Sequence, residues 1–312
     1  MNRRPLEIHR WLIAIVVLLL APSLLFAGLW IKNTLSAVYA VDRSRAGLEI
    51  LKELEPWLSA NALGKTISFP EISFAPEADL GVSSKAAEKL QLEFDNLSTG
   101  TTVSDAISRA REFSRNVFFA VDLTSAIDPD NVELSNLISE TLLTVVLESS
   151  ALVKASERIK QRDDLTVWDK MALTVQGGKF KVDADEVARA TNRPFLALPE
   201  RNATELTSLA KTYWKANGQF QKAGSLLLAS ALQAKTSSSI NNDQITAAYP
   251  DLLKASLALW QSSIDCLIAD FARIRYVLDT DFSCRIRSSC GGGGAISATS
   301  GIVGAASNNC CV

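Results

Sequence analysis

The chain has 312 residues, of which 47% are hydrophobic, and its 32 lysines and arginines nearly balance its 34 aspartates and glutamates. A formal net charge of −2 offers no basic surface for nucleic acid, so nucleic acid is excluded as a partner. The only histidine, His9, precedes the body of the chain, which excludes a histidine-based metal site or triad there. The sequence contains no GxxxxGK[ST], GxSxG or HExxH motif, so we expect neither enzymatic activity nor a cofactor.

An uncharged apolar stretch, Trp11–Trp30, follows a short N-terminal arm of residues 1–10. Its length of about twenty residues suits a helix that crosses the hydrocarbon core of a bilayer. The arm carries Arg3, Arg4 and Arg10. Because positive charge stays on the cytoplasmic side, we expect a cytoplasmic N-terminus, a single span in the inner membrane and a periplasmic body.

The two ends of this stretch are tryptophans, Trp11 and Trp30, and indoles favour the membrane–water interface. Pro22 lies mid-span, where neighbouring groups can satisfy the carbonyl that a proline leaves free. A cleaved signal peptide is the main alternative. It is disfavoured because the apolar run exceeds a secretory h-region and the candidate cleavage site at Ala27-Gly28 follows Leu25 and Phe26. A buried core helix is the third interpretation.

Apolar residues continue beyond the membrane segment at helical spacing, which predicts that the first helix runs to about Glu55, where Pro56 disturbs it. This seam comprises Val38, Val41, Leu48, Leu51 and Leu58. Residues 60–81 carry two prolines and two glycines without a period and are expected to form an irregular connection. Within it, Thr66–Phe74 is the only candidate strand, and the pattern is weak.

Two helices are predicted next. Ser83 and Ser84 can cap a helix over residues 85–97, and Thr102 or Ser104 starts another that runs to about Ile127. Residues 128–131, Asp-Pro-Asp-Asn, indicate a turn. A long helix follows, with a heptad-like stripe formed by Ile138, Leu142, Val145, Leu152 and Ile159.

The remaining helices have similar signals. Residues 163–166 can cap a helix that reaches Thr191 and contains Gly177-Gly178, which mark either a bend or a close backbone contact. Asn202 or Thr204 caps the next helix, whose seam is Leu206, Leu209, Tyr213, Phe220 and Leu227. A polar turn at residues 236–242 precedes a last helix that starts near Pro250. Its apolar face is Leu253, Trp260, Ile264, Leu267, Phe271, Ile274 and Leu278.

These patterns predict an all-α protein: a transmembrane helix continues into an antiparallel helical bundle over residues 31–282. Residues 283–312, rich in glycine, serine and cysteine, predict a disordered tail, which we hypothesise to be a frameshift product. Four cysteines lie in the tail and a fifth, Cys266, in the last helix, so the body is not stapled by disulfides. The tail spacing follows no zinc motif, and pairing of Cys266 with a tail cysteine stays open.

Three segments give the chain a family likeness: RAGLEILKELEPWL, FFAVDLTSAIDPDN and GGKFKVDADEVARATN. Together with the basic N-terminus and single span, residues 1–280 resemble the extracytoplasmic sensor region of bacterial transmembrane receptors, namely chemotaxis receptors, sensor histidine kinases and membrane-bound diguanylate cyclases. The resemblance implies a sensor ectodomain in signal transduction, a homodimer, and a receptor or kinase partner chain. The sequence departs from that pattern because it has no second span, HAMP-like linker or output domain.

Several groups of side chains are candidate sites. A charged cluster on the first helix could contact a ligand or a second copy, but pairs such as Arg45–Glu49 and Glu49–Lys52 make a solvated face the better interpretation. This cluster is Arg43, Arg45, Glu49, Lys52 and Glu53. Three aspartates at 122, 128 and 130 fit no calcium loop. Trp57, Trp168, Trp214 and Trp260 could line a pocket, although core positions are more common, and glycosylation motifs occur at Asn96 and Asn202.

We expect a single-pass membrane protein with a ligand-sensing ectodomain, a truncated receptor. No ligand-binding, catalytic or metal residue is identified by the sequence. The alternatives are a membrane-anchored interaction module without a small ligand, and a non-functional receptor fragment. A sensor should contain a pocket between helices with converging polar groups, whereas a scaffold should expose a large apolar stripe.

Overall fold

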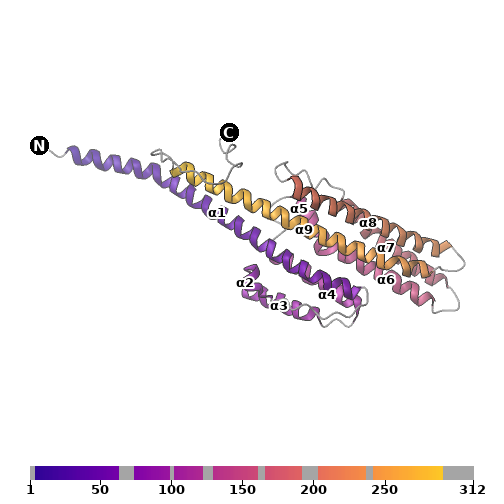
Figure 1. The fold of residues 1–312 in the computed structure, drawn as a ribbon. Helices are drawn as coiled ribbons and strands as arrows, with labels where there is room; N and C mark the ends of the chain where they lie inside the picture. Colours follow the sequence, from indigo (N-terminus) through magenta and orange to yellow (C-terminus); the bar gives the residue numbers. More distant parts are fainter. Residues whose placement is uncertain are drawn as a thin grey trace. The chain divides into compact units, whose positions relative to one another are not determined.

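The computed structural model describes residues 4–62, 74–98, 102–121, 129–160, 166–191, 203–236 and 242–290, and every regular element in them is helical (Figure 1). The all-α prediction is therefore confirmed for this part of the chain. The elements are α1 (Arg4–Ala62), α2 (Pro76–Leu80), α3 (Ser84–Leu97), α4 (Val103–Ala120), α5 (Pro129–Asn136), the π-helical turn η1 (Leu137–Thr141), α6 (Leu142–Lys160), α7 (Val167–Thr191), α8 (Ala203–Thr236) and α9 (Asn242–Cys290). The predicted strand at 66–74 lies almost wholly outside these ranges, and Phe74 is not in a regular element.

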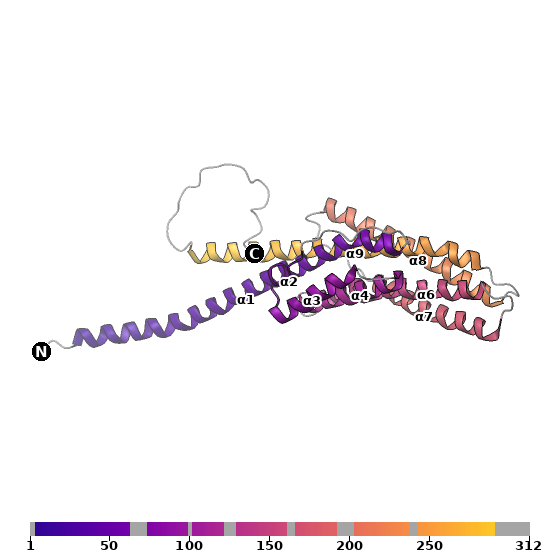
Figure 2. The same ribbon diagram turned by 90° about the horizontal axis from the view of Figure 1, so that it is seen from below.

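The chain divides into two compact units. One contains the chain ends, Met1–Val41 and Ala272–Val312, and the other, here called the body, is Asp42–Phe271. Helices α1 and α9 each contribute to both units. In the body, α6 packs on α7, α7 on α8, and α3 on α4 (Figure 2).

Helix α1 does not end at Glu55, as predicted, but continues through Pro56 to Ala62. Pro56 is exposed, so water can satisfy the carbonyl that lacks its amide partner. The next two residues, Trp57 and Leu58, are buried, and Asn61 Nδ2 donates to the Trp57 carbonyl at 2.9 Å. Packing of this last turn therefore outweighs the local cost of the proline.

The two parts of α1 differ in exposure. Leu18, Leu24 and Phe26 near the N-terminus are largely exposed, whereas Leu48 and Leu51 in the body are almost fully buried. The predicted membrane residues fall in the exposed part. Pro22 lies in a continuous helix, Trp30 is half-buried, and the side chains of Trp11, Arg4 and Arg10 lie outside the described residues, as does Arg3.

Three helical segments in the described part of the chain are long and apolar enough to cross a membrane: Leu20–Asn61, Val132–Lys160 and Asp243–Thr280. They differ in what covers them. Only 6% of the most apolar window of the first is buried, against 67% for each of the other two. The second and third therefore direct most of their apolar surface into the protein interior, whereas the first leaves it exposed.

Close packing brings α1 against α4. A Cβ atom at Gly47 would lie 3.0 Å from Val117 Cγ1, which is tighter than most Cβ contacts, so Val117 would have to shift to admit a side chain. The connection expected to be irregular at 60–81 contains the short helix α2, which ends at Gly81. Gly81 has φ of 58°, in the left-handed region that favours glycine.

An aromatic cluster joins α3 and α4. The ring centroids of Phe74 and Phe94 are 5.0 Å apart, and Phe113 lies 5.7 Å from both. Helix α3 matches its predicted range, with Ser83 at the N-cap, although the Ser83 hydroxyl makes no capping bond. Thr102 caps α4 by accepting a hydrogen bond from the Asp105 amide, but α4 ends at Ala120 rather than Ile127.

The predicted heptad-like stripe of residues 138–159 is buried throughout, which confirms it. The prediction of a turn at residues 128–131 was partly wrong, because Pro129 begins α5. Proline suits this position in the first turn of a helix. The π-helical turn η1 interrupts this long helix and was not predicted. Trp260 Nε1 of α9 donates a hydrogen bond to the Ile138 carbonyl within η1 at 2.8 Å.

Helix α7 begins with a reciprocal cap, in which the Asp169 amide donates to Thr166 Oγ1 and Asp169 Oδ2 accepts from the Thr166 amide. The helix is continuous through Gly177 and Gly178. A Cβ at Gly177 would be in ordinary contact with Ala231, and one at Gly178 would meet nothing, so neither glycine is required by a close backbone contact.

The boundaries of α9 differ from prediction at both ends. It begins at Asn242 rather than near Pro250, because Ile245 and Ala248 bury its first turns. It extends to Cys290, so residues 283–290 of the predicted tail are helical, and the rest of the tail lies outside the described residues. Of the polar turn expected at 236–242, Thr236 closes α8 and Asn242 opens α9, and residues 237–241 lie outside the description.

Buried serines are numerous in the body, and several satisfy their hydroxyls within their own helix. Ser149 donates to the Val146 carbonyl, Ser256 to Leu252, and Ser262 and Ser263 both to Leu259. These bonds span three or four residues, so a polar atom is buried without a partner from another helix.

Candidate functional site: a groove between α8 and α9

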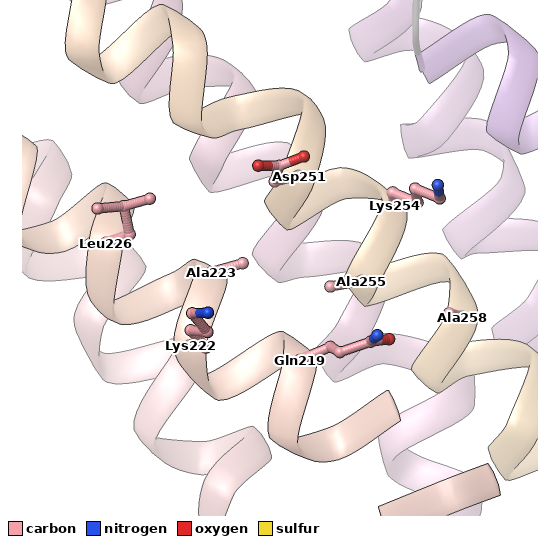
Figure 3. A pocket seen from close by; sticks show the side chains of 8 residues that line it. All are labelled: Gln219, Lys222, Ala223, Leu226, Asp251, Lys254, Ala255 and Ala258. Atoms are coloured by element: carbon pink, nitrogen blue, oxygen red, sulfur yellow. The ribbon is translucent and has the colours of Figure 1, made fainter. Parts of the chain in front are cut away.

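A groove of about 350 Å³ lies between α8 and α9 in the body. Figure 3 shows Ala223 of α8 and Ala255 of α9 facing each other across it, with longer polar side chains around them. The lining residues are Gln219, Lys222, Ala223 and Leu226 from α8, and Asp251, Lys254, Ala255 and Ala258 from α9. Small side chains thus form the floor and charged or amide groups form the rim.

The floor is set by the way these two helices pack. Ala223 and Leu227 of α8 and Leu252 and Ala255 of α9 are buried. A Cβ at Gly224 would contact Leu252 of α9 and Phe180 of α7, so α8 sits closely against both neighbours. Because alanines occupy the outer edge of the α8–α9 seam, the surface above them is left hollow.

A second hollow of about 480 Å³ continues along the same seam and shares Leu226 and Asp251 with the first. Its other lining residues are Ala229, Ser230, Gln244, Ala247 and Ala248. The two together form one elongated groove, defined here as the α8–α9 groove. Each hollow is within the size range of small-molecule sites.

The rim combines both signs of charge. Lys222 and Lys254 each present an ammonium group, one from each helix, and Asp251 presents a carboxylate between the two hollows. Gln219 adds an amide that can donate and accept hydrogen bonds. A ligand with a carboxylate could bind the lysines, and one with an amino group could bind Asp251.

No family model, curated protein or solved structure matches the chain.

The charged cluster predicted on the first helix is a partly paired surface. Arg45 Nε binds Glu49 Oε1 at 2.9 Å, as predicted. Lys52 does not pair with Glu49; its Nζ binds Asp265 Oδ1 of α9 at 2.7 Å. This ion pair joins α1 to the helix that forms one wall of the α8–α9 groove.

The four tryptophans do not form a common pocket. Trp57 and Trp260 are buried in the core, whereas Trp168 is 77% exposed and Trp214 is 42% exposed. The prediction of core positions is therefore confirmed for Trp57 and Trp260 and is wrong for Trp168 and Trp214.

The other candidate residues do not come together to form a site in the described part of the chain. Asp122 and Asp128 lie outside the described residues, as does the side chain of Asp130, and Asn202 is also outside. In the ranges that are described, no three His, Cys, Asp or Glu residues approach closely enough to hold a metal ion. Asn96 is exposed near the end of α3, and Cys266 is a buried free thiol.

Sequence analysis missed the α8–α9 groove. A signal was present in the alanines of the two helices, since Ala223, Ala229, Ala247, Ala255 and Ala258 all line it. A pattern of small residues, however, does not reveal which neighbouring helix faces it, so the groove depends on tertiary packing.

Proposed function

We propose that the chain is a single-pass membrane protein whose helical body senses a small ligand in the α8–α9 groove. In this proposal, Trp11–Trp30 spans the inner membrane, Arg3, Arg4 and Arg10 keep the N-terminus cytoplasmic, and an antiparallel helical bundle lies in the periplasm. The protein takes part in signal transduction, as its resemblance to receptor ectodomains implies, and acts through a partner chain.

The observation that carries the proposal is the continuity of α1. One helix, Arg4–Ala62, joins an exposed apolar segment to residues buried in the body. A membrane-embedded segment should present apolar side chains to lipid, and the exposure of Leu18, Leu24 and Phe26 supports this role. A displacement of the buried part can pass along an unbroken helix without a hinge.

The Lys52–Asp265 pair supports coupling between the groove and α1. Asp251 and Lys254 on the groove rim and Asp265 at the ion pair all belong to α9. A ligand that bridges the rims of α8 and α9 would favour one position of α9 over another, and Lys52 would follow Asp265. The ligand would thus shift the population between two packings of the bundle.

The charges on the rim favour an amino acid or short peptide as the ligand class. Its carboxylate would bind Lys222 and Lys254, its amino group would bind Asp251, and its side chain would rest on the alanine floor. The proposal includes no enzymatic step.

The test uses the full chain in lipid nanodiscs, screened by thermal shift against amino acids and dipeptides. We expect at least one ligand to raise the melting temperature, and the variants Lys254→Met and Asp251→Asn to abolish that rise. Glu88→Gln on α3, an exposed change far from the groove lining, is the matched control. A screen without any stabilising ligand, or ligand stabilisation unchanged in both groove variants, would contradict the proposal.

Membrane insertion is tested separately. Full-length protein expressed in bacteria should remain in the membrane pellet after alkaline carbonate extraction, whereas a chain starting at residue 33 should be released. Recovery of the full chain in the soluble fraction would rule out the anchor.

An anchored interaction module is the second candidate function. The observation that favours it is a row of large apolar side chains exposed on α7, including Trp168 and Met171. Such a surface is typical of protein–protein contact. A stable partner recovered by cross-linking, together with no ligand in the thermal-shift screen, would favour this alternative.

A further inference from the structure

Helix α7 has apolar side chains on two opposite faces. Leu173, Phe180 and Val187 are buried against the body. On the other side, five large apolar side chains are exposed, and these five positions are defined here as the outer α7 face: Val167, Trp168, Met171, Val175 and Val182. Trp168 is 77% exposed and Val182 is 62% exposed, so nothing in the described structure covers either end of this row.

The spacing of these residues is that of a coiled-coil seam. Trp168, Val175 and Val182 recur every seven residues, and Met171 lies three residues after the first, which places them at a and d positions of a heptad. Gly178 occupies the next d position, and a Cβ there would meet no atom within 4 Å. The seam therefore runs along about four turns of α7 on one side of the body.

We propose that the outer α7 face pairs in parallel with the same face of a second copy of the chain. The flanking charges select this occupant. In a parallel heptad pair, a g residue meets the e residue five positions later on the other helix. Lys181 is at g and Glu186 is at e, so two copies would form the Lys181–Glu186 pair twice.

The apolar seam ends at Val182 in this register. Asp185 and Arg189 follow at the next d and a positions, where each would lie beside the same residue of the partner helix, so the helices are expected to separate there. A hollow on α7 is lined by Val182, Asp185, Ala188 and Arg189, which leaves room for the partner's side chains. Within one chain, Lys181 and Asp185 are only loosely paired, at 3.9 Å, and both are exposed.

The antiparallel arrangement fits less well. Packing Met171 of one copy against Val175 of the other would set Lys181 opposite Val167 and place Glu186 and Arg189 beyond the start of the partner helix. The four charges would then find no opposite charge. A parallel pair instead sets Lys181 opposite Glu186 on both flanks, and it satisfies the two-fold symmetry of an interface between identical copies.

The size of the contact indicates a weak dimer. Covering the five apolar side chains in both copies would remove roughly 1,000 Å² from water in total, which is at the lower end for a specific interface. Confinement of both copies to one membrane would raise their effective concentration and favour pairing.

Charge reversal tests the parallel register in the full chain, labelled with fluorescent donor or acceptor and reconstituted in lipid vesicles. Lys181→Glu or Glu186→Lys alone would place like charges together on both flanks, and we expect each to weaken energy transfer between copies by about five- to tenfold in apparent affinity. The double variant Lys181→Glu/Glu186→Lys restores opposite charges and should recover wild-type transfer. Melting temperature is measured for each variant to verify that the body remains folded.

A second pair of variants tests the apolar seam. Val175→Glu should abolish energy transfer, whereas Leu92→Glu, at an exposed apolar position on α3, should leave it unchanged. The proposal is overturned if wild-type copies show no transfer, if the double charge swap fails to restore it, or if Val175→Glu and Leu92→Glu behave alike. The outcome is independent of the ligand screen, because neither variant touches the α8–α9 groove.

Discussion

Trp260 of α9 donates its indole N–H to the backbone carbonyl of Ile138, 2.8 Å away and 122 residues earlier in the chain. The acceptor lies in the π-helical turn η1. A π-helical turn shifts the backbone pairing by one residue, so a carbonyl in it can be left without its usual amide donor. The buried indole supplies that donor and ties α9 to the centre of the long α5–η1–α6 segment.

Replacing Trp260 by Phe should destabilise the body. The substitution keeps most of the apolar volume but removes the indole N–H that donates to the buried Ile138 carbonyl, at a cost of about 1–3 kcal/mol. The measurement is urea unfolding of the full chain in detergent, followed by circular dichroism. Trp168→Phe, at an exposed position, is the control and should change the unfolding free energy by less than about 0.5 kcal/mol. Equal effects of the two substitutions would contradict the role assigned to the hydrogen bond.

Reversing the charges of the Lys52–Asp265 pair should have a small effect on stability. The two side chains are 44% and 29% exposed, so the ion pair contributes no more than about 1 kcal/mol. We expect Lys52→Glu to lower the melting temperature slightly and Lys52→Glu/Asp265→Lys to restore it. A double variant as unstable as the sum of both single variants would show that the two residues do not interact.

The Asp183 carboxyl group should make the free energy of unfolding depend on pH. Burial raises the pKa of its carboxyl group above the usual value of 3.8, and the nearby carboxylates of Glu148 and Glu186 add to this, although Arg111 opposes it. The folded state therefore binds the proton more tightly than the unfolded state. The resulting stabilisation is fully present below pH 3.8 and is lost as the pH rises through the folded pKa.

Asp183→Asn imitates the protonated form and should raise the melting temperature at pH 7. The gain should be less than about 1 kcal/mol, because the side chain is partly exposed to solvent. The difference from wild type should shrink as the pH falls towards 4 or below. Glu88→Gln, an exposed change on α3, serves as the control. A difference that grows in acid would reverse the sign of the argument.

Adding a side chain at Gly47 should loosen the contact between α1 and α4. A Cβ there would lie 3.0 Å from Val117 and 3.4 Å from Val121, so Gly47→Val should cost about 1–3 kcal/mol through overpacking. Gly218→Val in α8 is the matched control, because nothing lies within 4 Å of its Cβ position. Thermal unfolding of the two variants checks the prediction, and a stable Gly47→Val protein would mean that α1 can move away from α4 at little cost.

The helices and much of their core could be predicted from the sequence because their apolar residues recur at helical spacing. The stripe from Ile138 to Ile159 is buried as expected. Prolines were the main source of error: Pro56 and Pro250 lie inside helices, because Trp57 and Ile245 beside them gain enough burial to hold the helix together. Local propensity alone does not contain that tertiary contribution.

The candidate site could not be predicted in the same way. Lys222, Asp251 and Lys254 look like ordinary solvated residues in the sequence, and they line one groove only because α8 and α9 lie side by side. The predicted ion pair between Glu49 and Lys52 was wrong for a related reason. Glu49 lies one turn away on the same helix, but in the folded body Lys52 pairs with Asp265 of α9. The exposed row on α7 was missed because that helix is apolar on both faces, which hides the boundary between core and surface.

Several serine hydroxyls inside the body bond to carbonyls of their own helices, so these hydroxyls do not lock one helix to a fixed height on its neighbour. Ser256, Ser262 and Ser263 in α9 all follow this pattern. Van der Waals contacts, unlike directional bonds, can be exchanged gradually as two surfaces slide. An axial step of α9 along the bundle would therefore keep these serine bonds, and a directional bond that it would have to break is the one from Trp260 to the Ile138 carbonyl.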